Sequence, residues 1–329
     1  MTKSWLAAHL FLDPPWSVFL SSFVFPLVTN WKEQRLIDRF FFIRYFEGGP
    51  HIRLRVHGDT KTLNQSLRLE MEKQFLEMYG STAFSNETLS FHLDHLEPKS
   101  IQFPPYEPET QRYGGTAGIP VCEELFESSS RCVLQFLKSQ QNPTYDNSLA
   151  FGLIMHLVFG YALDLTSTKL IDLAQFIKKC WIPRTIQLTQ KSAEDTHHES
   201  NQELQSQFET AYALQKETLI PLLATIWKQL MTEDPFEVSF LQEWLESGRR
   251  FNSKMNLLMD QELILPPPFP AKYTGIPLTD QNRFFPMYES LIHMTNNRLG
   301  ISNVDEAFIG FILEKFFQNV ILNHPAPVM

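Results

Sequence analysis

The chain has 329 residues, of which 43% are hydrophobic and 20% are charged, a composition typical of a globular protein with a sizeable core. Its formal net charge of -9 argues against direct nucleic-acid binding or an anionic-membrane surface, because both need clustered cations. The three cysteines are odd in number and lack C-x-x-C spacing, which fits a reducing compartment. We find no secretory signal and no run long enough to span a membrane, so the sequence predicts a cytoplasmic protein.

The first hundred residues mix strand and helix patterns. Two apolar strands are joined by Glu47-Gly48-Gly49-Pro50, and Gly-Gly supplies the positive φ angles of a tight turn. This segment therefore predicts a β-hairpin. The predicted elements are strands at 6–12, 37–46, 50–57 and 91–103, and helices at 16–29 and 62–78.

Strict alternation in the second hairpin strand separates a basic face from an apolar face. His51, Arg53, Arg55 and His57 lie about 7 Å apart on one face, and every residue between them is apolar. Such a row in an acidic protein favours an anion site, although arginines on a solvated strand face also pair with nearby carboxylates. Arg44 on the preceding strand would join the row only if the strand register allows it, and the sequence leaves this open.

From about residue 120 the pattern is largely helical. We expect an α+β fold, with an N-terminal mixed or antiparallel sheet and its hairpin packed on a mainly helical C-terminal half. The chain should form a single domain, with a mixed α/β part at 1–119 and a mainly helical part at 120–329. A polar stretch at 190–202 predicts an exposed loop, and its two adjacent histidines lack further ligands at a useful spacing, so we predict no metal site. The predicted helices are 122–137, 148–165, 169–179, 204–231, 236–258, 281–296 and 303–322.

A short segment before two glycines carries a possible ion pair. Glu109 and Arg112 are three residues apart and share a face if the turn is helical. Such a pair is also an ordinary surface salt bridge, which contributes roughly 0–1 kcal/mol. Gly114 and Gly115 indicate a backbone that bends tightly or approaches another group closely.

His293 and Arg298 lie near the end of a late helix. A histidine on an apolar helix is more often a hydrogen-bonded core residue than a catalyst. Gly300 is typical of a helix stop, and Arg298 in the last turn interacts favourably with the helix dipole in any case. None of the three segments alone establishes a function.

Taken together, the three segments are specific. They read F-F-I-R-Y with G-P-H-I-R-L-R, then Y-x-P-E-x-x-R-Y-G-G, and finally H-M-x-x-N-R. In order and approximate spacing they resemble the C-terminal elimination domain of lantibiotic dehydratases, which also occurs as a separate thiopeptide-type bacteriocin biosynthesis protein. The resemblance extends over nearly the whole chain.

The resemblance implies a lyase that needs no cofactor. In the family, a large N-terminal part uses glutamyl-tRNA to esterify serine and threonine residues of a ribosomal precursor peptide with glutamate. The C-terminal domain then eliminates that glutamate and leaves dehydroalanine or dehydrobutyrine. The present chain would be the small half of a split dehydratase, with the precursor peptide and a separate large glutamylating subunit as partners.

The resemblance also implies roles for individual residues. Arg53 or Arg55, together with Arg112 and His293, match catalytic residues, with the arginines near the glutamate and His293 transferring a proton. The sequence leaves open which of Arg53 and Arg55 is essential. Glu109 matches a glutamate that could hold the amino group of the glutamyl ester. The residues implied in substrate binding are Arg44, His51, Glu109, Tyr113 and Arg298.

Two other functions stay open. Thiopeptide pyridine synthases resemble the same domain and join two dehydroalanines in a formal cycloaddition with release of a leader peptide. A non-catalytic peptide-binding subunit is the third reading, since a strand edge can accept an extended peptide. Apolar faces on the long helices would fit either a homodimer or a contact with the large subunit, and no sequence pattern chooses between them.

Overall fold

The chain folds into two compact units. The structure is a computed structural model that describes residues 2–80, 100–140, 143–189, 197–269 and 276–321. Unit 1 comprises Met1–Pro108 and Phe126–Pro143, and unit 2 comprises Glu109–Leu125 and Thr144–Met329. Helix α5 (Gly115–Ser139) begins in unit 2 and ends in unit 1. The expected single domain, with its parts divided between 119 and 120, stays a prediction.

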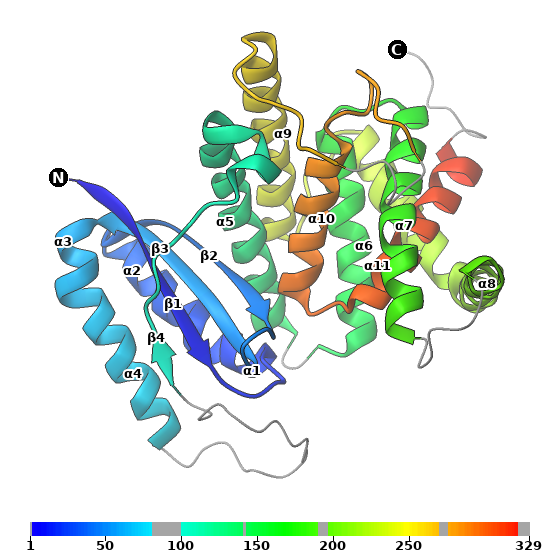
Figure 1. The fold of residues 1–329 in the computed structure, drawn as a ribbon. Coiled ribbons are helices and arrows are strands. Elements are labelled where there is room, and N and C mark those ends of the chain that lie inside the picture. The colour runs from blue at the N-terminus through cyan, green and yellow to red at the C-terminus, as the bar shows by residue number, and fades with distance from the viewer. Residues whose placement is uncertain (1, 81–99, 141–142, 190–196, 270–275, 322–329) are drawn as a thin grey trace. The chain divides into compact units, whose positions relative to one another are not determined.

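Unit 1 contains an antiparallel sheet with the strand order β2-β3-β1-β4 (Figure 1). The predicted hairpin is confirmed, because β2 and β3 pair directly and the connecting Gly48 and Gly49 have φ values of 77° and 107°. The strand expected at 91–103 is described only as β4, since residues 91–99 lie outside the described part of the chain. The strands are β1 (Lys3–Phe11), β2 (Ile37–Tyr45), β3 (His51–Asp59) and β4 (Ile101–Gln102).

Two helical runs of unit 1 match the helices predicted at 16–29 and 62–78. Their buried aromatic rings meet, as in the edge-to-face contact of Phe19 and Phe75 at 6.0 Å between ring centroids. The apolar face of the sheet contributes buried residues such as Phe42 and Leu54 to the unit 1 core. The first run is α1 (Ser17–Phe19), η1 (Leu20–Val24) and α2 (Phe25–Glu33), and the second is α3 (Thr60–Thr62), η2 (Leu63–Leu67) and α4 (Arg68–Gly80).

Unit 2 is helical in the residues that the structure describes, and the α+β class predicted for the chain is confirmed. Helices α7 and α11 approach closely at Gly310, where an added Cβ would lie 2.7 Å from the backbone nitrogen of Lys178. No helix within the described ranges is both long and apolar enough to cross a membrane. In addition to the first part of α5, unit 2 contains η3 (Thr110–Tyr113), α6 (Tyr145–Ala162), α7 (Ser167–Thr189), α8 (His197–Met231), α9 (Ser239–Asp260), α10 (Phe285–Leu299), α11 (Asn303–Phe316) and η5 (Phe317–Ile321).

Most helix boundaries differ from the predicted ones by a few residues, α7 extends ten residues beyond the predicted end, and two further differences bear on the predicted segments. Helix α5 starts at Gly115 rather than near Pro120, so the glycine-rich segment already belongs to its first turns. The prediction of a loop at 190–202 is wrong for residues 197–202, because α8 already begins at His197. Glutamate and glutamine have good helix propensity, so a polar stretch can extend a helix without an apolar face of its own. Residues 190–196 lie outside the described ranges.

Candidate functional site

The basic row of β3 lies on one face of the unit 1 sheet and extends to the neighbouring strands. Directly opposite residues of antiparallel strands share a face. His9 of β1 is opposite Arg53, and Tyr45 of β2 is opposite His51. The apolar residues between the basic ones are fully buried on the other face, so the predicted separation into two faces is confirmed.

His51 orients Arg53. The Nδ1 atom of His51 lies 2.7 Å from the carbonyl oxygen of Gly49, and a carbonyl only accepts, so Nδ1 must carry the proton. The other ring nitrogen, Nε2, is then free to accept the Nε–H of Arg53 at 3.1 Å. Burial is the main cause that lowers the pKa of His51, which favours this neutral form. His51 is 2% exposed, so it lies beneath Arg53 rather than at the surface.

The guanidinium groups of the row rest on aromatic rings. Arg53 lies 3.4 Å above the ring centroid of Tyr45, and Arg55 lies 5.2 Å from that of Phe41 and 4.9 Å from that of Tyr106. These cation–π contacts restrict where each planar group can point. When a hydrogen bond holds Nε and an aromatic ring lies against the guanidinium plane, the outer N–H groups of an arginine point in a defined direction. This arrangement suits recognition of a carboxylate.

His9 is a member of the basic face that the sequence analysis missed. Its ring stacks on His51 with 4.9 Å between centroids. Burial is the main cause that lowers the pKa of His9 to about 4, and the charges of Arg53 and Arg55 lower it further, so His9 is neutral at pH 7. Alternation along β1 predicts that Trp5 and His9 share one face of that strand. Neither strand alone shows that β1 pairs with β3, so the sequence could not predict that His9 lies beside Arg53.

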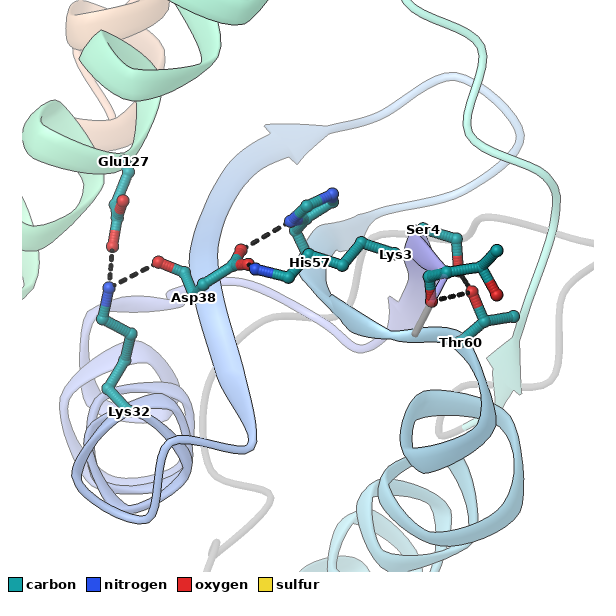
Figure 2. A network of polar contacts seen from close by, with 8 residues as sticks. Lys3, Ser4, Lys32, Asp38, His57, Thr60 and Glu127 are labelled. Carbon is teal, nitrogen blue, oxygen red and sulfur yellow. Dashed lines mark hydrogen bonds and ion pairs between the residues drawn. The ribbon is translucent and has the colours of Figure 1, made fainter.

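His57, at the end of the row, belongs to a separate ion-pair network (Figure 2). Its Nδ1 lies 2.5 Å from Asp38 Oδ1, and Lys3 Nζ lies 2.6 Å from Asp38 Oδ2. Burial raises the pKa of Asp38, but hydrogen bonds from Lys3 and His57 outweigh burial and lower it below its ordinary value. Lys32 donates to the Asp38 carbonyl oxygen and to the Glu127 carboxylate. The polar groups at this end of the row therefore bond to one another and have a structural role.

Arg44 does not share the face of the row. The register sets Arg44 opposite Ile52, whose side chain lies on the apolar face. Burial lowers the pKa of Arg44 to about 10. The register therefore separates Arg44 from Arg53 and Arg55, and its assignment to substrate binding stays a prediction.

In unit 2, the segment before the glycines forms the expected ion pair. Arg112 Nη1 lies 3.0 Å from Glu109 Oε2 across the 3₁₀ helix η3, and both side chains are exposed. Burial lowers the pKa of Arg112, but Tyr113, Glu109 and Glu289 outweigh burial and hold it above its ordinary value. A Cβ at Gly118 would lie 2.1 Å from the carbonyl oxygen of Tyr113, which confirms the expected close backbone approach.

Tyr113 ties η3 to helix α10. Its hydroxyl lies 3.1 Å from Ser290 Oγ, and the residue is 3% exposed. Burial raises the pKa of Tyr113 to about 12, so the phenol stays protonated. In this structure Tyr113 holds the segment that carries Glu109 and Arg112, and its predicted contact with substrate stays untested.

His293 lies on α10 between a carboxylate and an indole ring. Its Nδ1 lies 2.7 Å from Glu306 Oε1, and its ring stacks on Trp181 with 4.7 Å between centroids. Trp181 donates its Nε1–H to Glu289 Oε1 at 2.8 Å, and Glu289 is also one of the charges that act on Arg112. Trp181, Glu289 and Glu306 were not predicted, because each comes from a different helix turn or element than His293.

Arg298 lies in the last turn of α10 and is fully buried, with 1% of its surface exposed. Gly300 follows with a φ of 78°, which confirms the predicted helix stop. A fully buried guanidinium is poorly placed to contact a peptide at the surface, so we leave Arg298 out of the substrate contacts proposed below.

The predicted residues are divided between the two units. Arg44, His51, Arg53 and Arg55 belong to unit 1; Glu109, Arg112, Tyr113, His293 and Arg298 belong to unit 2. Within unit 1 the structure brings His51, Arg53 and Arg55 together with His9. Within unit 2 it connects η3 with His293 through α10. No group of three or more metal-ligating side chains occurs in the described ranges.

Three comparisons relate the chain to known proteins. A family model described as lantibiotic biosynthesis dehydratase C-term matches residues 5–317. The epidermin biosynthesis protein EpiB of Staphylococcus epidermidis is 24% identical over 139 residues, which are 42% of this chain and 13% of EpiB. The chain therefore spans only a small part of that relative.

Similar folds occur in three solved structures. TsrL matches with a TM-score of 0.66 and 17% identity over 96% of this chain and 95% of TsrL. The pyridine synthase TbtD from thiomuracin biosynthesis matches with a TM-score of 0.67 and 13% identity over 96% of this chain and 98% of TbtD. The tRNA-dependent lantibiotic dehydratase MibB from Microbispora sp. 107891 matches with a TM-score of 0.58 and 19% identity over 98% of this chain but 28% of MibB.

Proposed function

Because the chain belongs to the lantibiotic biosynthesis dehydratase C-terminal family, we propose that it eliminates glutamate from glutamylated serine and threonine residues of a precursor peptide. The products would be dehydroalanine and dehydrobutyrine. The protein would act as the small half of a split dehydratase, while a separate large subunit adds the glutamate.

The reaction sets three requirements. A base takes the α-proton, and the electron pair of the Cα–H bond forms the Cα=Cβ double bond. The Cβ–O pair leaves with glutamate as a carboxylate. Negative charge develops on the carbonyl oxygen of the modified residue and on the leaving group, so fixed positive groups lower the barrier.

The observation that carries the proposal is the environment of Arg53. His51 holds its Nε and Tyr45 lies under its plane, so the outer N–H groups are presented in one direction. Among the described residues, Arg53 makes no ion pair with a carboxylate. A planar fork of this kind is a good ligand for a carboxylate, such as that of a glutamyl ester.

The other residues fit the remaining requirements. Arg55 and Arg112 supply further positive charge, and Glu109 is an exposed carboxylate that could hold the amino group of the glutamyl ester. His293 is the proposed proton acceptor, because its Nε2 makes no hydrogen bond with a described residue and its side chain is 16% exposed. His51 would act through Arg53 rather than on the peptide itself.

The similarity in fold to TbtD supports pyridine formation as the second candidate. That reaction joins dehydroalanines and releases a leader peptide, so it has no glutamate to bind. Arg112, Glu109 and His293 together therefore favour elimination. A non-catalytic peptide-binding subunit would bind precursor peptide but leave its mass unchanged.

Mass spectrometry of the precursor peptide tests the proposal. The peptide is incubated with the large dehydratase partner and glutamyl-tRNA, with and without this protein. We expect glutamyl adducts that convert to losses of water only when this protein is present. Adducts that persist unchanged would reject elimination, and a dehydroalanine-containing peptide would then test ring formation.

A further inference from the structure

Glu306 is a fully buried carboxylate whose surroundings contain few compensating groups. Its exposed fraction is 0%, and it lies on α11, facing α10. Its hydrogen-bond partners among the described residues are His293 Nδ1 at 2.7 Å and Asn296 Nδ2 at 3.1 Å. Neither a lysine nor an arginine pairs with it in the described ranges, which is unusual for a buried carboxylate.

The hydrogen bonds behind Glu306 have one consistent direction. His156 Nε2 lies 2.6 Å from Asn296 Oδ1, an oxygen that can only accept, so His156 carries its proton on Nε2. Burial lowers the pKa of His156 to about 4, which keeps it neutral. The Asn296 amide must then point its NH₂ group toward Glu306. A flipped amide would set two oxygens against each other.

The Glu306 carboxylate determines the proton on His293. A carboxylate oxygen only accepts, and Asn296 already donates to one of the two oxygens, so His293 donates to the other from Nδ1. Trp181 covers one face of the same ring at 4.7 Å. The imidazole is therefore held at one nitrogen and on one face, and Nε2 is left as the proton acceptor.

We propose that Glu306 is a positioning residue that fixes the Nδ1–H form of His293 and stabilises the positive charge His293 gains when Nε2 takes the α-proton. The inference rests on the proposed function and adds a carboxylate–histidine pair to it. The α-proton moves from Cα to Nε2, the leaving glutamate takes the Cβ–O electron pair, and the imidazolium later returns its proton to water. Glu306 itself transfers no proton in this sequence.

Glu306→Gln keeps the size of the side chain and removes its charge. Glu314→Gln is the matched control, because Glu314 is also a buried carboxylate of α11 but pairs with Lys178 and Gln175. We would measure elimination from a synthetic peptide that carries a glutamylated serine. For Glu306→Gln we expect kcat to fall by about 10²-fold, the scale of general-base catalysis, with KM unchanged because Glu306 cannot touch the peptide.

A second measurement does not depend on activity. The ¹⁵N chemical shifts of His293 in the wild-type protein, assigned with His293→Gln, report which ring nitrogen carries the proton. We expect Nδ1–H in wild type and a larger share of Nε2–H in Glu306→Gln, because a neutral amide is a weaker acceptor than a carboxylate. Glu314→Gln should match wild type.

The outcomes separate the two proposals. The inference would be overturned if His293 in the wild-type protein carries its proton on Nε2. It would also be overturned if a folded Glu306→Gln variant eliminates glutamate as fast as Glu314→Gln. If Glu306→Gln does not fold, the wild-type tautomer alone decides. If wild type eliminates no glutamate, the proposed function fails, while the tautomer still tests the carboxylate–histidine pair.

Discussion

Arg53→Lys tests the anion site most directly, because it keeps the positive charge of the basic row and removes the guanidinium plane. A lysine cannot reproduce the 3.1 Å bond from Nε to His51. It also loses most of the contact that Arg53 makes 3.4 Å above the Tyr45 ring. The new ammonium group can offer a carboxylate a point charge but no parallel pair of N–H bonds.

The expected loss is larger in catalysis than in stability. A hydrogen bond to a charged group contributes about 1.5–3 kcal/mol, and losing one in the transition state lowers kcat/KM about 10- to 150-fold. Arg53 is only half-buried, so water can replace part of its bond to His51. The free energy of unfolding should therefore fall by only about 1 kcal/mol, mainly from the weaker ring contact.

The assay follows elimination from a synthetic glutamylated peptide by mass spectrometry over time, with urea denaturation as the measure of stability. Arg68→Lys is the matched control, because Arg68 lies 4.6 Å over the ring of Phe103 but is outside the basic row. It should keep wild-type kcat/KM. A folded Arg53→Lys variant with wild-type kcat/KM would refute carboxylate binding by Arg53. Equal losses of kcat/KM in Arg53→Lys and Arg68→Lys would show that the effect is not specific to the basic row.

Three other predictions concern unit 2. His293→Ala should stop elimination and leave glutamylated peptide accumulating, because the α-proton loses its acceptor; normal dehydration in the mass spectrum would reject that role. Gly310→Ala should lower the free energy of unfolding by about 1–3 kcal/mol, because its Cβ would lie 2.7 Å from the Lys178 backbone nitrogen; an unchanged urea midpoint would contradict this packing. Burial lowers the pKa of His156 from 6.5 to about 4, so the unfolded chain binds more protons between these values. Stability should fall by up to about 3 kcal/mol as the pH drops through this window, and His156→Gln should weaken that dependence; identical urea-denaturation profiles would count against it.

The local features of the unit 1 site could be predicted from sequence. Alternation in a strand has a period of two residues, so Arg53 and Arg55 had to share a face wherever the strand packed. The Gly48-Gly49 turn joins two neighbouring strands, and the structure confirms that hairpin. The face of Arg44 stayed open because it depends on register, and a shift of one residue would have moved Arg44 to the other side.

The features that could be predicted from the residues are therefore short-range: strands, helices, the basic row, the Glu109–Arg112 spacing and the motifs that mark the family. Which distant groups complete these segments depends on the folded arrangement of the elements. His9 meets Arg53 only because β1 pairs with β3, and Glu306 meets His293 only because the first turn of α11 lies beside α10. Backbone periodicity is set by neighbouring residues, whereas these pairings depend on how the buried faces of whole elements fit together, and no local pattern encodes that fit.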